Sequence, residues 1–303
     1  MAISSIAVVT GATGFIGSRV VRRLLQAGLM VRALSGGSSR HRLIDVADRV
    51  CWYGLAESDI HKAACDATHF FHFAVAYDRP GISDESLHEC NVALPLRVID
   101  ALPDRPDDPC RCVLGDTFFR KFPVPATAQS RYTASKQLLA RTLADRPLRP
   151  GLRVALLQIE QVYGPGDSLD KVLPRVTAQL LQPVARVALT SAQQRRDLVH
   201  VDDVVEAAWV LVCSDWQGLA TVPCGSGQAV PMRAVFERLK QVTGSPSELG
   251  FGDRPADNDI ESSVADLAWL RGLGWQPSVE LNDGLHALAD DVRVRLQSAA
   301  LTG

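Results

Sequence analysis

The chain has 303 residues, a length that suggests about two domains. Apolar residues make up 47% of it and charged residues 22%, which is the composition of a globular protein with a sizeable core. The 32 basic residues nearly balance the 34 acidic ones, leaving a net charge of −2. Because nucleic-acid binding requires a basic face, we expect no nucleic-acid partner.

Neither a membrane span nor a secretory leader is expected. The longest apolar runs, 6–9 and 207–213, are far shorter than the roughly 20 residues of a spanning helix. No cationic segment followed by an apolar run opens the chain. The seven cysteines and seven histidines show no metal-ligand spacing. We therefore expect a cytoplasmic protein with reduced thiols, no metal and no membrane contact.

The first half of the chain alternates β-rich runs with helical periods. We expect strands at 3–9, 29–34, 68–74, 110–114 and 152–159, and helices at 14–27, 57–65, 83–102 and 131–143. Strands separated by helices indicate parallel βαβ units. The apolar run 69–76 suits a sheet that is covered on both faces. The expected fold class is therefore α/β, a doubly wound parallel sheet of the Rossmann type.

After Tyr163, glycine and proline punctuate shorter elements, among them expected helices at 203–213 and 232–242. We expect residues 1–162 to form an NAD(P)-binding Rossmann domain and residues 163–303 a smaller α+β substrate-binding domain. Segments near 198–224 are expected to return to the first domain.

Three glycines with GxxGxxG spacing lie between the first expected strand and the first expected helix. Gly11 permits a tight turn, Gly14 lets the backbone approach a pyrophosphate, and Gly17 allows close packing of helix on strand. The helix N-terminus offers free N–H groups to the anion. We expect the cofactor to contact Gly11, Thr13, Gly14, Phe15, Ile16 and Gly17.

The segment after the second expected strand bears on the choice of dinucleotide. An acidic residue there would bind the ribose 2′-hydroxyl of NAD and repel the 2′-phosphate of NADP. Residues 31–40 contain neither Asp nor Glu. They offer four donors for a 2′-phosphate: Ser35, Ser38, Ser39 and Arg40. This composition favours NADP(H), while NAD(H) stays possible.

Tyr132 and Lys136 lie four residues apart on an expected helix, and therefore on one face of it. A neighbouring cation stabilises a phenolate, so the Tyr132 phenol is expected to exchange a proton with a carbinol or ketone oxygen. Lys136 is also placed to bind the nicotinamide ribose. Thr117, after the preceding strand, has the hydroxyl needed to polarise the carbonyl oxygen, and Asp116 is a residue that could orient it.

These features together resemble the extended short-chain dehydrogenase/reductase family, of the sugar-nucleotide epimerase/dehydratase type. The likeness runs through the motifs FHFA at 71–74, NV at 91–92, VYGPG at 162–166, RDLVHVDD at 196–203 and LGWQP at 273–277. It implies that Ala74 lies near the cofactor. It also implies a homodimer built on the helices at 83–102 and 131–143.

Two departures from the family pattern point to one branch. Asp116-Thr117 stands where the family usually has Ser-Ser, and Gln158 and Glu160 precede the VYGPG turn in place of the usual LRP sequence. These residues resemble the abequose-synthase branch, which implies NADPH-dependent reduction of a nucleotide-activated 4-keto-6-deoxysugar. The resemblance also implies that Thr117, Glu160, Arg196 and Arg254 contact substrate, the two arginines at its diphosphate.

His200, Asp202 and Asp203 are expected to be structural, fixing the start of the following helix. Two other functions stay open. One is a nucleotide-sugar 4-epimerase with bound NAD, against which the absence of an acidic residue in 31–40 counts. The other is a non-catalytic NADP(H)-binding regulator, which would not need Thr117, Tyr132 and Lys136.

Overall fold

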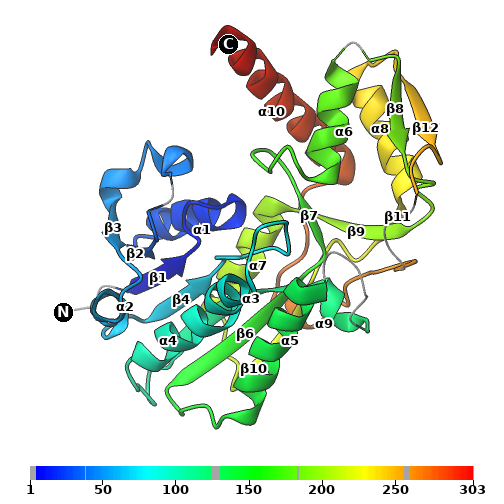
Figure 1. The fold of residues 1–303 in the computed structure, drawn as a ribbon. Helices are drawn as coiled ribbons and strands as arrows, with labels where there is room; N and C mark the ends of the chain where they lie inside the picture. Colours follow the sequence, from blue (N-terminus) through cyan, green and yellow to red (C-terminus); the bar gives the residue numbers. More distant parts are fainter. Residues whose placement is uncertain (1–4, 38, 124–129, 183, 256–259, 303) are drawn as a thin grey trace. The chain divides into compact units, whose positions relative to one another are not determined.

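The computed structural model divides into two compact units (Figure 1). It describes residues 5–37, 39–123, 130–182, 184–255 and 260–302. The first unit comprises Met1–Ile159, Val205–Pro223 and Gly272–Trp275. The second comprises Glu160–Val204, Cys224–Arg271 and Gln276–Gly303.

The first unit is built on a seven-stranded parallel sheet in the order β10-β6-β5-β4-β1-β2-β3. The strands are β1 (Ile6–Thr10), β2 (Met30–Leu34), β3 (Val50–Tyr53), β4 (His69–His72), β5 (Cys110–Thr117), β6 (Leu152–Ile159) and β10 (Leu219–Cys224). Every residue of β1 and β6 is buried, as expected for strands covered on both faces. The predicted doubly wound α/β fold is confirmed.

Helices lie on both faces of this sheet (Figure 1). On one face, Arg23 of α1 (Phe15–Gln26) pairs with Glu206 of α7 (Val201–Cys213) at 2.7 Å. On the other face, α2 (Glu57–Ala64) packs against α4 (Leu94–Ala101). The remaining helical elements of this unit are η1 (His41–Leu43), η2 (Ala47–Arg49), α3 (Asp84–His88), η4 (Phe118–Lys121) and α5 (Ser130–Asp145).

Two local differences from the predicted elements concern the site. The strand expected at 110–114 continues to Thr117, so Thr117 is the last residue of β5 rather than part of a following loop. The helix expected at 83–102 is interrupted by a π-helical turn, η3 (Glu89–Ala93), between α3 and α4. Turns of this kind are frequent at functional sites.

The second unit combines a three-stranded sheet, β11-β9-β7, with a separate two-stranded sheet, β12-β8. Its elements are β7 (Gln161–Tyr163), α6 (Val172–Leu181), β8 (Arg186–Leu189), β9 (Arg195–His200), β11 (Ala229–Pro231), α8 (Met232–Thr243), β12 (Glu248–Phe251), α9 (Ala268–Gly272) and α10 (Leu281–Thr302). Helices α6, α8 and α10 pack on one another around a buried apolar cluster.

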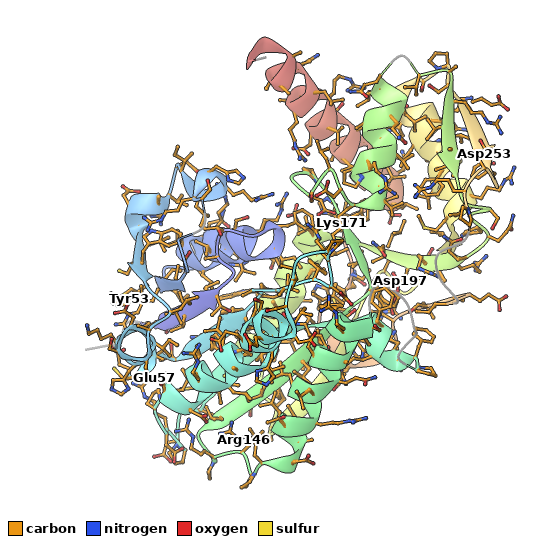
Figure 2. The ribbon with its side chains drawn as sticks, viewed as in Figure 1. Tyr53, Glu57, Arg146, Lys171, Asp197 and Asp253 are labelled. Atoms are coloured by element: carbon orange, nitrogen blue, oxygen red, sulfur yellow. The ribbon has the colours of Figure 1, made fainter. Side chains whose placement is uncertain are left out.

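Buried carboxylates hold the loops of the second unit. The carboxylate of Asp197, labelled in Figure 2, accepts hydrogen bonds from the backbone N–H groups of Ser226, Gly227 and Ala265. Asp203 accepts from the backbone of Ser278 and Val279. The Asp203 side chain, in the first turn of α7, therefore anchors a distant segment of the chain. Among the described residues, no helix has the length and apolar content needed to cross a bilayer.

Candidate active site

The glycine loop joins β1 to α1 through close backbone contacts. The N–H of Gly14 donates to the carbonyl oxygen of Gly11 at 2.9 Å. Gly11 has a left-handed φ of +71°, and a Cβ there would meet the backbone N of Ala74 at 2.3 Å. A Cβ on Gly17 would lie 2.0 Å from the Gly11 oxygen. Both positions therefore require glycine.

This loop suits a pyrophosphate. Gly14 is the N-cap of α1, so no side chain occupies the helix N-terminus, and no acidic residue lies in the first turn. The exposed N–H groups and the positive end of the helix dipole favour an anion there. The residues present therefore fit a dinucleotide cofactor.

A cavity of about 630 Å³ opens beside the loop. The predicted cofactor residues that line it are Gly11, Thr13, Gly14, Ser35 and Ala74. Among the described residues predicted to bind the cofactor, those that do not line it are Phe15, Ile16, Gly17, Ser39, Arg40, Tyr132 and Lys136; Ser38 lies outside the described residues. The cavity is also lined by residues outside the predicted cofactor set, namely Ala12, Leu34, Gly36, Leu55, Phe73, Val75, Glu85, Ser86, Glu89, Cys90 and Leu94.

The segment after β2 keeps its basic side chains near the surface. Ser39 and Arg40 are exposed, and the Arg40 guanidinium lies 4.1 Å from the ring centroid of Trp52. The cavity wall at the end of β2 consists of Leu34, Ser35 and Gly36 and carries no carboxylate.

Thr117, Tyr132 and Lys136 come together at the carboxyl end of β5. Tyr132 and Lys136 project from α5, and both are buried, with 7% and 3% of their surface exposed. The Tyr132 hydroxyl is hydrogen-bonded to Thr117. The Lys136 ammonium donates to the carbonyl oxygen of Gly115 at 2.7 Å. The structure thus brings together the three residues that were predicted to be catalytic.

The electrostatics of this cluster differ from the sequence-based expectation. Burial raises the pKa of Tyr132 well above its ordinary value, the charges of Tyr77 and Asp116 add to the rise, and the hydrogen bond with Thr117 opposes it. Burial lowers the pKa of Lys136, against the opposing effects of Asp116 and Cys90. The expected lowering of the Tyr132 pKa by Lys136 is therefore not found. The burial of the phenol, which a sequence does not reveal, is the larger effect.

Sequence reasoning gave no site role to the π-turn, although it supports α5. The Asn91 side chain is fully buried and makes hydrogen bonds of 2.9 and 2.8 Å with the backbone of Ala76. It also donates to Ser135 at 3.0 Å, and Ser135 donates to the Tyr132 carbonyl oxygen at 2.7 Å. On the same loop, Tyr77 packs against Tyr132 with ring centroids 5.2 Å apart.

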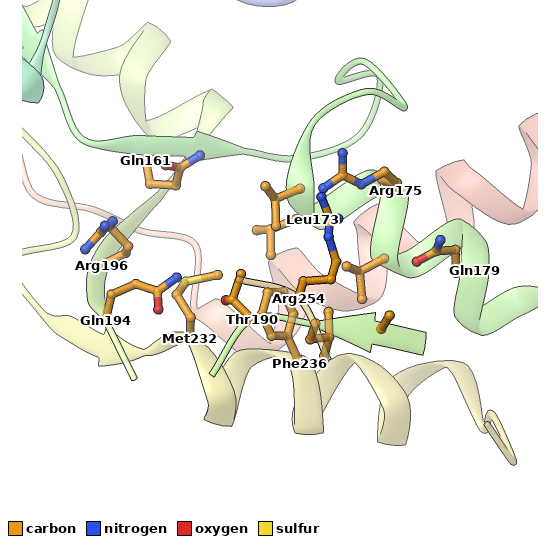
Figure 3. A pocket seen from close by; sticks show the side chains of 14 residues that line it. Gln161, Leu173, Arg175, Gln179, Thr190, Gln194, Arg196, Met232, Phe236 and Arg254 are labelled. Atoms are coloured by element: carbon orange, nitrogen blue, oxygen red, sulfur yellow. The ribbon is translucent and has the colours of Figure 1, made fainter. Parts of the chain in front are cut away.

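The second unit contains its own cavity, of about 220 Å³. Its lining combines apolar side chains with arginine and amide side chains (Figure 3). Figure 3 shows the guanidinium groups of Arg175 and Arg254 pointing toward one another, with Arg196 beside Gln161 and Gln194. The lining residues are Gln161, Val172, Leu173, Arg175, Val176, Gln179, Ala188, Leu189, Thr190, Gln194, Arg196, Met232, Phe236 and Arg254.

The cationic groups of this cavity differ in their surroundings. Arg196 is buried, and its guanidinium donates to the Arg195 carbonyl oxygen at 2.8 Å. Burial lowers the pKa of Arg196, and Glu160 opposes that effect. Glu160 is itself buried, accepts a 2.7 Å hydrogen bond from Ser263, and does not line the cavity.

The doubly wound sheet, the glycine loop after its first strand and the Tyr-Lys pair of α5 are together typical of the short-chain dehydrogenases/reductases. The model of the NAD dependent epimerase/dehydratase family matches residues 7–218. The chain belongs to that family. It is therefore an oxidoreductase-type enzyme that uses a nicotinamide cofactor.

Individual relatives agree with this assignment. CDP-abequose synthase of Salmonella muenchen is 26% identical over 282 residues, which cover 91% of this chain and 94% of that protein. UDP-glucose 4-epimerase of Thermus thermophilus, solved with NAD, has a TM-score of 0.76 at 25% identity and covers 95% of this chain and 99% of its own. UDP-glucose 4-epimerase of Thermotoga maritima has a TM-score of 0.81 at 22% identity, covering 96% and 99%.

Proposed function

We propose that the enzyme reduces the 4-keto group of a nucleotide-activated 6-deoxysugar with NADPH. The observation that carries the proposal is the cluster of Thr117, Tyr132 and Lys136 at the end of β5. The similarity to CDP-abequose synthase over 91% of the chain supports the sugar class.

In this reaction Tyr132 donates a proton to the ketone oxygen as that oxygen gains negative charge. The raised pKa keeps the phenol protonated, which is the state that an acid requires. Thr117 is placed to hydrogen-bond the same oxygen, and the role proposed for Lys136 is to bind the nicotinamide ribose. NADPH, when bound, supplies the hydride that reduces the ketone carbon. The residues proposed to hold it are those of the glycine loop, together with Ser35 and Ala74.

We propose NADPH rather than NADH because no carboxylate lines the cavity at the end of β2. Within the described residues Arg40 forms no ion pair, so its charge is available to a 2′-phosphate. The relative from Thermus thermophilus was solved with NAD, so the comparison of the two cofactors is a direct test.

The cavity of the second unit is the proposed seat of the nucleoside diphosphate. Arg196 and Arg254 carry the positive charge that a diphosphate needs, and Arg175 adds to it. In the described part of the chain, Arg175 and Arg254 have no acidic partner. Two like charges that point toward one another without a counterion favour an anion between them. Glu160 acts on this site through Arg196.

The decisive experiment is incubation of the enzyme with NADPH and a panel of CDP-, dTDP-, GDP- and UDP-linked 4-keto-6-deoxysugars. We expect loss of the NADPH absorbance with at least one of them and formation of the 4-hydroxy sugar. No turnover across the panel would refute the proposal.

The second candidate is a nucleotide-sugar 4-epimerase, favoured by the epimerases among the structural relatives. An epimerase returns its cofactor to the starting state in each cycle. Interconversion of two 4-hydroxy sugars without net consumption of NADPH would therefore establish it in place of the reductase.

We further propose a homodimer built on the helical segment α3–η3–α4 and on α5, the helices that the family resemblance assigns to the interface. Leu138 on α5 is 44% exposed and is available for such a contact. Light scattering at micromolar concentration measures the mass directly, and a monomer mass would refute the dimer.

A further inference from the structure

An ion pair lies directly against the catalytic cluster. The carboxylate of Asp116, in β5, accepts hydrogen bonds of 2.9 and 2.7 Å from Nε of Arg120, in η4. A second guanidinium nitrogen of Arg120 lies 2.5 Å from the same carboxylate. The Asp116 and Arg120 side chains are only 3% and 15% exposed. A buried bidentate pair of this kind has one well-defined geometry.

Asp116 and Arg120 flank Thr117 in the chain, and Thr117 is the hydrogen-bonding partner of the Tyr132 phenol. Thr117 follows Asp116 in the chain, and its hydroxyl accepts a 3.3 Å hydrogen bond from the N–H of Phe119. Arg120 also reaches Thr221 of β10 at 3.4 Å. The turn from β5 into η4 is therefore fixed at both ends.

We propose that Asp116 and Arg120 are positioning residues, which hold Thr117 against Tyr132 and together set the local charge at which Tyr132 and Lys136 work. The inference rests on the proposed function, in which Tyr132 is the proton donor. Neither Asp116 nor Arg120 touches the reacting atoms in this scheme; both act through Thr117, Tyr132 and Lys136.

The charged and titratable groups near Tyr132 and Lys136 lie on β4, on the loop after it, on η3, on β5 and on η4. Tyr132 faces Tyr77 on the loop after β4 and Asp116 on β5. Lys136 faces Asp116, Cys90 of η3 and Arg120 of η4. His72 of β4 also senses the charge of Lys136. Within this set, Asp116 and Arg120 form an ion pair with each other. Each charge of the pair can be removed separately by substitution.

Removing one charge of the pair should shift the pKa values of Tyr132 and Lys136 in a defined direction. Without the Asp116 charge, the remaining Arg120 cation lowers the pKa values of Tyr132 and Lys136. Without the Arg120 charge, the lowering effect of Arg120 on the Lys136 pKa is lost, and the Asp116 carboxylate, which is no longer neutralised, raises the Tyr132 pKa further. Ketone reduction requires a protonated Tyr132, so the rate falls as pH rises through these pKa values. The basic limb of the pH profile therefore moves down in Asp116→Asn and up in Arg120→Gln.

The test compares the pH dependence of kcat/KM in wild type, Asp116→Asn, Arg120→Gln and the double variant. We expect the two single variants to shift the basic limb in opposite directions, by about one pH unit or more. In the double variant the basic limb should lie close to that of wild type, because both charges are gone. Its kcat should be lower, because the turn from β5 into η4 has lost the ion pair. Shifts in the same direction, or lower kcat without any shift, would overturn the proposal.

Two further variants separate charge from geometry. Arg120→Lys keeps the charge and loses the bidentate fork, so its limb should stay in place while kcat falls. Arg146→Gln is the matched control, because Arg146 pairs with Asp100 beyond the far end of α5 (Figure 2). We expect its profile to equal that of wild type. If Arg146→Gln shifted the basic limb of the pH profile as much as Arg120→Gln does, the proposal would be overturned.

A measurement without substrate keeps the inference distinct from the proposed function. The ultraviolet absorbance of the Tyr132 phenolate, obtained as each protein minus its Tyr132→Phe version, should develop at lower pH in Asp116→Asn than in wild type. The same onset in both would overturn the proposal. If the phenol titrates as expected but no 4-keto sugar reacts, the proposed function fails and the positioning pair stands.

Discussion

The Lys136 ammonium donates a hydrogen bond to the carbonyl oxygen of Gly115, at 2.7 Å. Gly115 precedes Asp116 and Thr117, so the last three residues of β5 each make a different contact with the site. Gly115 holds the lysine, Asp116 holds Arg120, and Thr117 contacts the catalytic phenol. The carboxyl end of β5 therefore contacts every member of the cluster. The first prediction concerns the Tyr132 phenol.

Tyr132→Phe should abolish turnover and change NADPH affinity by no more than a few-fold. The phenol supplies the proton, whereas the cavity of the glycine loop is lined by other residues. Single-turnover kinetics and fluorescence titration with NADPH measure the two quantities separately. A variant with near wild-type kcat would remove Tyr132 from the mechanism.

Sequence patterns predicted the first unit closely, because its elements are long or strongly apolar. The strand at 152–159 has the same bounds in the structure, and the Tyr132–Lys136 spacing placed both groups on one face of α5. The π-turn at Glu89–Ala93 lies inside a segment that was predicted as one continuous helix, 83–102, and was not foreseen. For this reason Glu89 and Cys90 were missed as cavity residues.

The second unit was harder to predict for a physical reason. Strands β7 and β11 are three residues long, and β8 and β12 are four. Such strands contain at most two full alternations, too few to separate a strand from a loop. Arg196 was chosen through the family resemblance, and the structure places it in one cavity with Arg254 and Arg175.

The second prediction concerns acid stability. Burial lowers the pKa of His69 to about 4 and that of His72 well below its ordinary value. Their folded-state pKa values lie below the unfolded value of 6.5, so the stability from the neutral rings is complete above that pH. It is lost as pH falls from 6.5 toward 4, by about 1.4 kcal/mol per pH unit for each histidine.

Chemical denaturation between about pH 7.5 and 5 checks this dependence. His69→Gln should reduce the slope of unfolding free energy against pH by about one proton. An undiminished slope in His69→Gln would contradict the assignment.

The third prediction is that NADPH binds more tightly than NADH and that Arg40 carries much of the difference. Losing one charge-assisted contact to the 2′-phosphate should weaken NADPH by roughly 10-fold or more in Arg40→Ala. NADH, which lacks that phosphate, should bind the variant as it binds wild type. Equal affinities of wild type for the two cofactors would refute the preference and strengthen the epimerase candidate.

The fourth prediction is that Arg196 binds the substrate diphosphate and does no chemistry. Removing one charge-assisted phosphate contact should cost about 1.5–3 kcal/mol of binding. That corresponds to roughly 10- to 150-fold in affinity. In Arg196→Ala we therefore expect the bare nucleoside diphosphate to inhibit far more weakly, while NADPH affinity stays the same. If the contact persists in the transition state, kcat/KM falls mainly through KM.

Because Arg196 lies beside the buried Glu160, the test needs a check on folding and a neighbouring control. Thermal unfolding of Arg196→Ala and of the double variant with Glu160→Gln shows whether an uncompensated carboxylate accounts for the loss. Arg195→Ala removes the exposed arginine next in the chain, which does not line the cavity, and should keep the wild-type inhibition constant. If wild type and a folded Arg196→Ala bind the diphosphate equally, the anion is held by Arg175 and Arg254. Arg254→Ala would then show the loss instead, because its guanidinium points toward Arg175 across the same cavity.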